Sequence, residues 1–170
     1  LLLVGKLDIN KLMHFMEYTE ISNTGINASR IGLGTWAIGG WMWGGTDEKR
    51  SIETIHAAID KGVTLIDTAP VYGFGKSEEI VGKGLQHAPK SRDELIVATK
   101  TALEWTDNGV FRNSTRDRIR KEVEDSLKRL QTDYIDVYQV HWPDPLVPFE
   151  ETAQVLYDLY KEGKIRAIGV

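Results

Sequence analysis

Short apolar runs alternate with amphipathic segments along most of the chain. The runs rich in strand-forming residues lie at 31–36, 63–69, 95–100, 134–142 and 166–170. Between them, apolar residues recur every three or four positions, as on one face of a helix, within residues 46–61, 77–86, 114–130 and 148–162. Strand and helix pairs of roughly 30 to 40 residues are typical of a parallel sheet covered by helices.

Local signals predict where several of these elements begin. Thr46 is predicted to cap the first helix, and Ser114 with Asp117 has the pattern of a capping box ahead of the third. Residues 101–113 read as a long loop, because they lack a clear apolar period. Residues 16–32 resemble a β-hairpin, which we expect to cover one end of the sheet.

Composition narrows the class of protein. The 170 residues carry a formal charge of -4 with both signs interspersed, which argues against a nucleic-acid partner. Cysteine is absent, so disulfides and thiolate metal sites are excluded, and a reducing cytoplasm is the expected location. No apolar run approaches the ~18 residues of a membrane span, so no membrane partner is expected.

Residues 1–15 do not resemble a signal peptide; we expect an upstream extension there and one domain over residues 16–170.

Residues 32–37, GLGTWA, match the dinucleotide-binding pattern G-x-G-x-x-A, and Glu53 follows about twenty residues later. In that motif a helix opens at the second glycine. Here the glycine-rich stretch GGWMWGG at 39–45 prevents such a helix, so the pattern argues against a Rossmann site.

Residues 70–77, PVYGFGKS, follow a strand, precede a helix and end like a phosphate-binding P-loop. A P-loop needs glycine where Pro70 stands, because its backbone N–H groups must face phosphate and proline has none. A nucleotide binder around Gly75, Lys76 and Ser77 is kept as a minor alternative. Otherwise Lys76 and Ser77 belong to the first turn of a helix.

Side chains that can carry or stabilise protons stand at the ends of three consecutive strands. Asp67 ends the second strand and Tyr72 lies in the loop after it, Lys100 ends the third, and His141 ends the fourth. In a parallel sheet these ends share one edge, which carries the active site in βα barrels. Each residue alone has an ordinary structural explanation, so the functional hypothesis depends on their joint occurrence.

The chemistry of this set is complementary. A free phenol has a pKa of about 10, too high for an efficient proton donor near neutrality, and a nearby ammonium lowers that pKa. Asp67 can supply the counter-charge that keeps a buried Lys100 protonated. His141 can hydrogen-bond a carbonyl oxygen and hold it near Tyr72. The set therefore predicts reduction of a small carbonyl compound, with Tyr72 protonating the oxygen.

The stretches GLGTWAIGG, LIDTAPVYGFGKSEEIVGKGL, LIVATK, RIRKEVEDSLKRLQTDYIDVYQVHWPD and KEGKIRAIGV resemble the aldo-keto reductase family, in order, from Ile31 to Val170. The HWPD variant at 141–144 is most like the bacterial, general-stress-type branch. The resemblance implies an α/β fold of the (β/α)8 TIM-barrel type and an NADPH-dependent oxidoreductase acting on aldehydes and ketones.

The resemblance also implies roles for individual residues. The catalytic tetrad corresponds to Asp67, Tyr72, Lys100 and His141, with Tyr72 as the general acid. Contacts to the nicotinamide cofactor correspond to Gly34, Thr35, Trp36 and Asp67. Trp41 and Trp43 in the first loop are expected either to line the substrate pocket or to pack within the loop. Tyr72, His141 and Trp142 are expected to complete the pocket.

The chain ends at Val170, ahead of further cofactor-binding residues of the family. The resemblance therefore implies a barrel truncated after about four βα units and the start of a fifth strand. Open sheet edges favour self-association. The alternative to an enzyme is a non-catalytic half-barrel remnant or interaction module.

Overall fold

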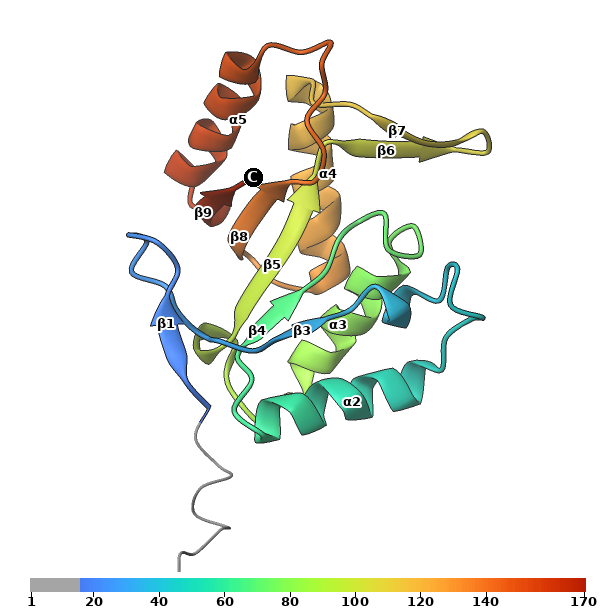
Figure 1. Cartoon of the computed structure of the whole chain (residues 1–170), viewed down its shortest axis with the longest axis vertical. Coiled ribbons are helices and arrows are strands. Elements are labelled where there is room, and N and C mark those ends of the chain that lie inside the picture. The colour runs from blue at the N-terminus through green and yellow to red at the C-terminus, as the bar shows by residue number, and fades with distance from the viewer. Residues whose placement is uncertain (1–15) are drawn as a thin grey trace, which may run out of the picture.

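The computed structural model describes residues 16–170, and the predicted extension at 1–15 lies outside the described residues. A parallel sheet runs through its centre, with the strand order β3-β4-β5-β8-β9 (Figure 1). These strands are β3 (Gly32–Gly34), β4 (Leu65–Asp67), β5 (Ile96–Thr101), β8 (Ile135–Val140) and β9 (Ile165–Gly169). The connecting helices are α2 (Glu48–Asp60), α3 (Lys76–Gln86), α4 (Arg116–Leu130) and α5 (Phe149–Lys161). The predicted α/β architecture with a parallel sheet is confirmed.

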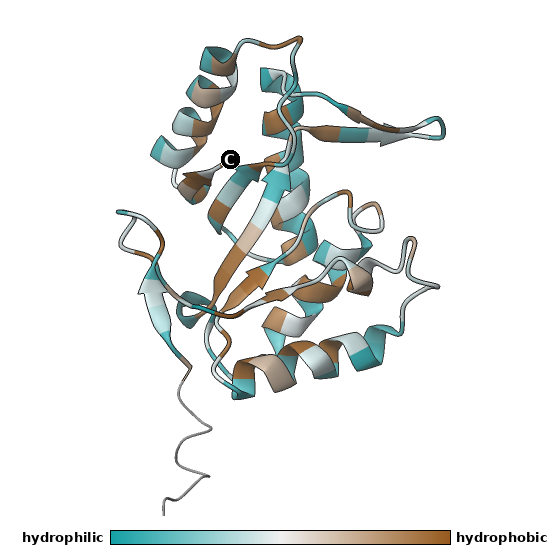
Figure 2. Ribbon diagram, viewed as in Figure 1, coloured by the Kyte–Doolittle hydropathy of each residue, from teal (hydrophilic) through white to brown (hydrophobic). Residues whose placement is uncertain are grey.

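The helices cover one face of the sheet with most of the apolar core. Figure 2 shows apolar residues concentrated in the strands and on the helix surfaces that face them. Ile55 and Ile59 of α2 pack there with Ile66 of β4, as do residues from the other three helices. Among residues 16–170, no helix combines the length and the apolar character that crossing a membrane requires.

The predicted hairpin covers the other face near the amino ends of the strands. It consists of β1 (Tyr18–Glu20) and β2 (Asn27–Ser29), which pair antiparallel. Its buried Ile26 and Ala28 pack in one cluster with residues of β5, β8 and β9. Ser29 exchanges hydrogen bonds of 2.9 Å with Thr64, the residue before β4. The hairpin therefore closes the end of the sheet opposite the predicted chemistry.

The prediction of a long loop at residues 101–113 is wrong. These residues form a second hairpin, β6 (Leu103–Thr106) and β7 (Gly109–Arg112), which projects beyond the sheet in Figure 1. Gly109 has a φ of +118°, so glycine permits the backbone conformation at this turn. The hairpin is an insertion between a strand and a helix of the βα repeat. Its four-residue strands are too short to show a clear alternation of apolar and polar residues.

Two predicted helix caps are also wrong. Asp47, rather than Thr46, caps α2, because its carboxylate accepts the N–H of Arg50 at 3.0 Å. Thr115 precedes α4, while the backbone N–H of Ser114 donates to Asp144 at 3.2 Å. In both cases the helix begins one residue later than a cap at the predicted position requires.

A buried ion cluster lies toward the amino ends of the strands. Asp136, in the second position of β8, is fully buried and pairs with Arg92 at 2.8 Å and Arg166 at 2.6 Å. Its Oδ2 also accepts the backbone N–H of Val97 on β5 at 2.9 Å. One carboxylate thereby links β8 to β5 and β9.

Candidate active site

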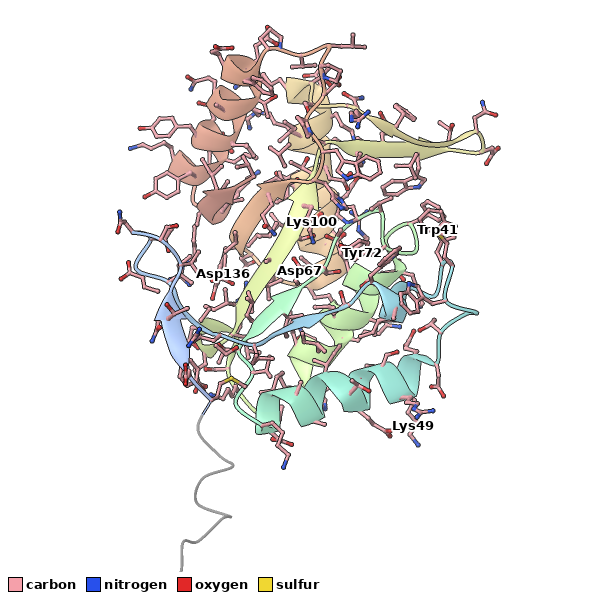
Figure 3. The ribbon with its side chains drawn as sticks, viewed as in Figure 1. Trp41, Lys49, Asp67, Tyr72, Lys100 and Asp136 are labelled. Carbon is pink, nitrogen blue, oxygen red and sulfur yellow. The ribbon has the colours of Figure 1, made fainter. Side chains whose placement is uncertain are left out.

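Four predicted residues meet at the carboxyl ends of the parallel strands. Asp67 is the last residue of β4 and Lys100 the fifth of the six residues of β5. Tyr72 lies between β4 and α3, and His141 directly follows β8. Figure 3 labels Asp67, Lys100 and Tyr72 close together in this part of the molecule. Because all the strands point in one direction, three separate connections deliver these side chains to one edge.

Lys100 is held by three oxygens. Its Nζ donates to the two carboxylate oxygens of Asp67 at 2.8 and 2.9 Å and to the carbonyl oxygen of Thr68 at 2.9 Å. The Lys100 side chain is 14% exposed and that of Asp67 is 36% exposed. This pair keeps an ammonium charge inside the site, and one side of the carboxylate remains open to solvent.

Tyr72 is fixed by a close contact between two loops. Gly73 has a φ of +63°, and a Cβ there would lie 2.1 Å from the carbonyl oxygen of Gly39. No other residue fits this position, since the two backbones already touch. The carbonyl of Tyr72 accepts the N–H of Ser77 at 3.1 Å, and Lys100 Nζ lies 4.9 Å from the centre of the phenol ring. The loop thus places the phenol beside the ammonium.

His141 stands on the other side of the phenol. Its ring centre lies 5.8 Å from that of Tyr72, at an interplanar angle of 85°. Burial and, to a smaller extent, the positive charge of Lys100 together lower the pKa of His141 to about 4, against the opposing effect of Asp67. The imidazole is therefore neutral near pH 7, with an N–H to donate and no charge of its own.

Of the residues predicted to contact the cofactor, Gly34 and Trp36 are exposed beside Asp67. Gly34 is the register partner of Asp67, and a Cβ added there would meet no atom within 4 Å. Thr35 differs, because it is fully buried and its hydroxyl donates to the carbonyl oxygen of Asp67 at 2.9 Å. Open space therefore adjoins the carboxylate along the Gly34 side of β3.

Three tryptophans lie near Tyr72 and His141. Trp36 lies 6.1 Å from Tyr72 between ring centres and 5.5 Å from Trp43. Trp142 lies 5.8 Å from His141. Trp36, Trp43 and Trp142 are all exposed, so the structure places aromatic surface on two sides of the tetrad.

Sequence reasoning missed two aromatic residues that extend this surface. The ring centre of Phe74 lies 4.9 Å from that of Trp41, which Figure 3 labels, and 5.7 Å from that of Trp105 on β6, with tilted rings in both pairs. The signal for Trp105 was the Asn108-Gly109 pair, which favours a hairpin turn and would have placed a strand before it. Nothing in the sequence indicates the contact of Phe74, because it depends on how three loops pack.

The two nucleotide-binding patterns take ordinary structural roles. Residues 37–39 form only a short 3-10 helix, so no dinucleotide-binding helix opens there. Lys76 pairs with Glu48 at 2.9 Å, and that hydrogen bond raises the pKa of Lys76. Ser77 is fully buried within the first turn of α3. Both side chains of the P-loop alternative are thus engaged within the protein.

Comparisons with known proteins agree on one family. The model of the Aldo/keto reductase family matches residues 30–170. The aldo-keto reductase YhdN of Bacillus subtilis is 73% identical over 155 residues, covering 91% of this chain and 46% of that protein. The NADH-specific methylglyoxal reductase of Escherichia coli is 46% identical over 169 residues, covering 91% of this chain and 51% of that protein.

A solved structure is similar over the same region. The glycerol dehydrogenase AKR11B4 of Gluconobacter oxydans superimposes with a TM-score of 0.82 at 53% identity, covering 90% of this chain and 47% of that one. The chain spans about half the length of the curated relatives it matches.

Proposed function

The chain belongs to the aldo/keto reductase family, and from that premise we propose that it reduces aldehydes and ketones to alcohols with hydride from NADPH. The predicted resemblance and the α/β, TIM-barrel-type fold class are confirmed. The observation that carries the proposal is the Asp67–Lys100 ion pair beside the Tyr72 ring, at the carboxyl ends of the strands.

Each member of the tetrad has one task in the proposed reaction. Tyr72 donates its proton to the carbonyl oxygen as the alcohol forms. Lys100 stabilises the negative charge that the phenol oxygen acquires, and Asp67 keeps Lys100 protonated. His141, neutral at pH 7, donates its N–H to the carbonyl oxygen and holds the substrate against Tyr72.

The residues of β3 and β4 fit a nicotinamide cofactor. Such a cofactor, when bound, supplies the hydride to the carbonyl carbon. The exposed Gly34 and Trp36, with the open side of Asp67, would hold its nicotinamide ribose end. Thr35 is buried and would not contact the cofactor directly; it would help to position Asp67 through its hydrogen bond to the carbonyl oxygen of Asp67. NADPH is the donor expected from the family resemblance, and the NADH-specific name of one relative makes the choice between the two a direct test.

The pocket supports a small carbonyl substrate with an apolar group. Trp41, Trp43 and Trp142 present exposed aromatic surface on the loops that surround the tetrad, alongside Tyr72 and His141. Aromatic walls bind apolar groups, while the few polar side chains orient the carbonyl.

The chain contains no cysteine, which suits a reducing compartment, and we propose the cytoplasm as its location.

Titration of the chain with NADPH and, separately, with NADH tests the cofactor assignment. Five tryptophans, of which Trp36 lies closest to Tyr72, provide the fluorescence signal. We expect saturable quenching, tighter for NADPH, and weaker binding by Trp36→Ala. Binding of neither cofactor would contradict the proposal, and tighter binding of NADH would correct the choice of donor.

The edge strands favour a second proposal, self-association. The edge strands of the parallel sheet are β3 and β9. Ile31, next to β3, is 64% exposed and Ile168 of β9 is 43% exposed. Unpaired strand edges with apolar side chains associate readily with further strands. Sedimentation velocity should show a concentration-dependent dimer that Ile168→Lys weakens; a monomer at every concentration would leave this proposal without support.

A further inference from the structure

A buried carboxylate behind the site has no role in the proposed reaction. Glu78, in the first turn of α3, is fully buried. Its Oε1 accepts the hydroxyl of Thr99 at 2.6 Å, and its Oε2 accepts Nε of Arg129 on α4 at 2.6 Å. Arg129 in turn donates to Glu122 at 2.8 Å. Both oxygens of Glu78 are therefore committed to fixed donors.

The partner of Glu78 stands next to a member of the tetrad. Thr99 and Lys100 are consecutive on β5, and side chains alternate between the two faces of a strand. Thr99 points to the helices, where it meets Glu78, while Lys100 points to the face that holds Asp67. The bond to Glu78 thus fixes β5 on its helix-facing side, one residue before Lys100.

Ser77, the neighbour of Glu78, makes the corresponding contacts to Thr35 and Thr68, the residues that directly follow β3 and β4. Its fully buried Oγ lies 2.8 Å from the hydroxyl and 2.9 Å from the carbonyl oxygen of Thr35, and it accepts the hydroxyl of Thr68 at 3.1 Å. Thr35 donates to the carbonyl oxygen of Asp67. The backbone N–H of Ser77 also donates to the carbonyl of Tyr72.

We propose that Ser77 and Glu78 are positioning residues, which fix the relative places of Asp67, Tyr72 and Lys100 through the first turn of α3. This inference rests on the proposed function, because it concerns the same tetrad. Catalytic groups tolerate little misplacement, and an error of about 1 Å can cost about 100-fold in rate. The first turn of α3 bonds to the carboxyl ends of β3, β4 and β5, and a helical turn meets that requirement better than the loops do.

The chain offers a matched pair of variants to test the Glu78 contact. Thr99→Val removes the hydroxyl that bonds Glu78 and preserves the shape of the side chain. Thr101→Val makes the same change two residues later on the same face of β5, where the buried hydroxyl lies beside Tyr138 and makes no bond to Glu78. A loss of a buried hydroxyl alone affects both variants equally, so a difference between them reports on the Glu78 bond.

The first readout is kinetic. With an aldehyde and the nicotinamide donor that binds, we expect kcat of Thr99→Val to fall by about 10- to 100-fold with KM within about twofold, while Thr101→Val keeps the wild-type kcat. Glu78→Gln should lower kcat less than Thr99→Val, because its amide oxygen can accept from Arg129 while its amide nitrogen donates to the hydroxyl oxygen of Thr99. Equal kcat values for the two threonine variants would overturn the proposal.

The second readout does not need turnover. A lysine ammonium held by three acceptors exchanges its protons slowly and gives a distinct NMR resonance, which Lys100→Met identifies by its loss. We expect Thr99→Val to shift or broaden this resonance and Thr101→Val to leave it unchanged. An unchanged resonance in Thr99→Val contradicts positioning even if the chain shows no reductase activity. Absence of activity with a shifted resonance contradicts the proposed function alone.

Discussion

Both ends of the same parallel sheet contain a carboxylate paired with a cation, and the two pairs differ in every other respect. Asp136, toward the amino ends, is fully buried and accepts from two arginines and the N–H of Val97. Asp67, at the carboxyl ends, is 36% exposed, and its lysine lies beside a phenol and an imidazole. Every donor around Asp136 is permanently charged or part of the backbone.

Under the proposed function, this difference separates a structural ion pair from one that takes part in the reaction. Among residues 16–170, Asp136 accepts from two arginines and a backbone N–H, and its side chain is fully buried. At Asp67 the pair is open on one side and adjoins Tyr72, a group able to give up a proton. An ion pair therefore indicates an active site by its exposure and its neighbours, and its presence alone is weak evidence.

The largest expected effect is on turnover at the carboxyl end. Asp67→Asn removes the counter-charge of Lys100, and we expect aldehyde reduction to slow by about 100-fold or more, since the two carboxylate oxygens no longer hold the ammonium beside Tyr72. Unfolding should change by no more than about 1 kcal/mol, because Asp67 is partly exposed. Steady-state kinetics and urea denaturation measure the two effects. A variant that is strongly destabilised but turns over normally would contradict this prediction.

At the amino end the effect should fall on stability. Asp136→Asn leaves two arginines without their carboxylate, and we expect the free energy of unfolding to drop by about 3 kcal/mol. The loss stays at the low end for a buried pair because both arginines are partly exposed and can be solvated. Urea denaturation gives the value, and cofactor titration should match wild type below the unfolding range. Unaltered stability would show that this cluster does not hold the strands together.

A smaller effect concerns pH. The pKa of His141 is about 4 in the folded protein against 6.5 for an unperturbed histidine, so the unfolded chain takes up a proton that the folded one does not. Stability contributed by the neutral ring is complete above about pH 6.5 and is lost as the pH falls toward 4, by roughly 1 to 2 kcal/mol after allowing for partial exposure. His141→Gln should reduce this fall in thermal or urea unfolding between those pH values. An identical pH dependence in both proteins would contradict the burial of a neutral imidazole.

The sequence predicted the carboxyl-end residues well for a topological reason. Parallel strands place their ends along one edge, so Asp67, Lys100 and His141 could be brought together from their positions after apolar runs. Asp136 and Glu78 escaped notice because their arginine partners lie up to 51 residues away in the chain, at distances that no local pattern records. Trp105 was missed because its hairpin interrupts the βα alternation.

Turnover by Tyr72→Phe, beside Tyr138→Phe as the matched control, tests the central claim most directly. Both changes remove one phenol oxygen, and that of Tyr138 is fully buried beside Thr101, in the core between the sheet and the helices. We expect the chain to reduce an aldehyde, Tyr72→Phe to lose about 100- to 10,000-fold in kcat while still binding the cofactor, and Tyr138→Phe to keep its rate. Equal rates for Tyr72→Phe and the unaltered chain would contradict the assignment of Tyr72 as the proton donor.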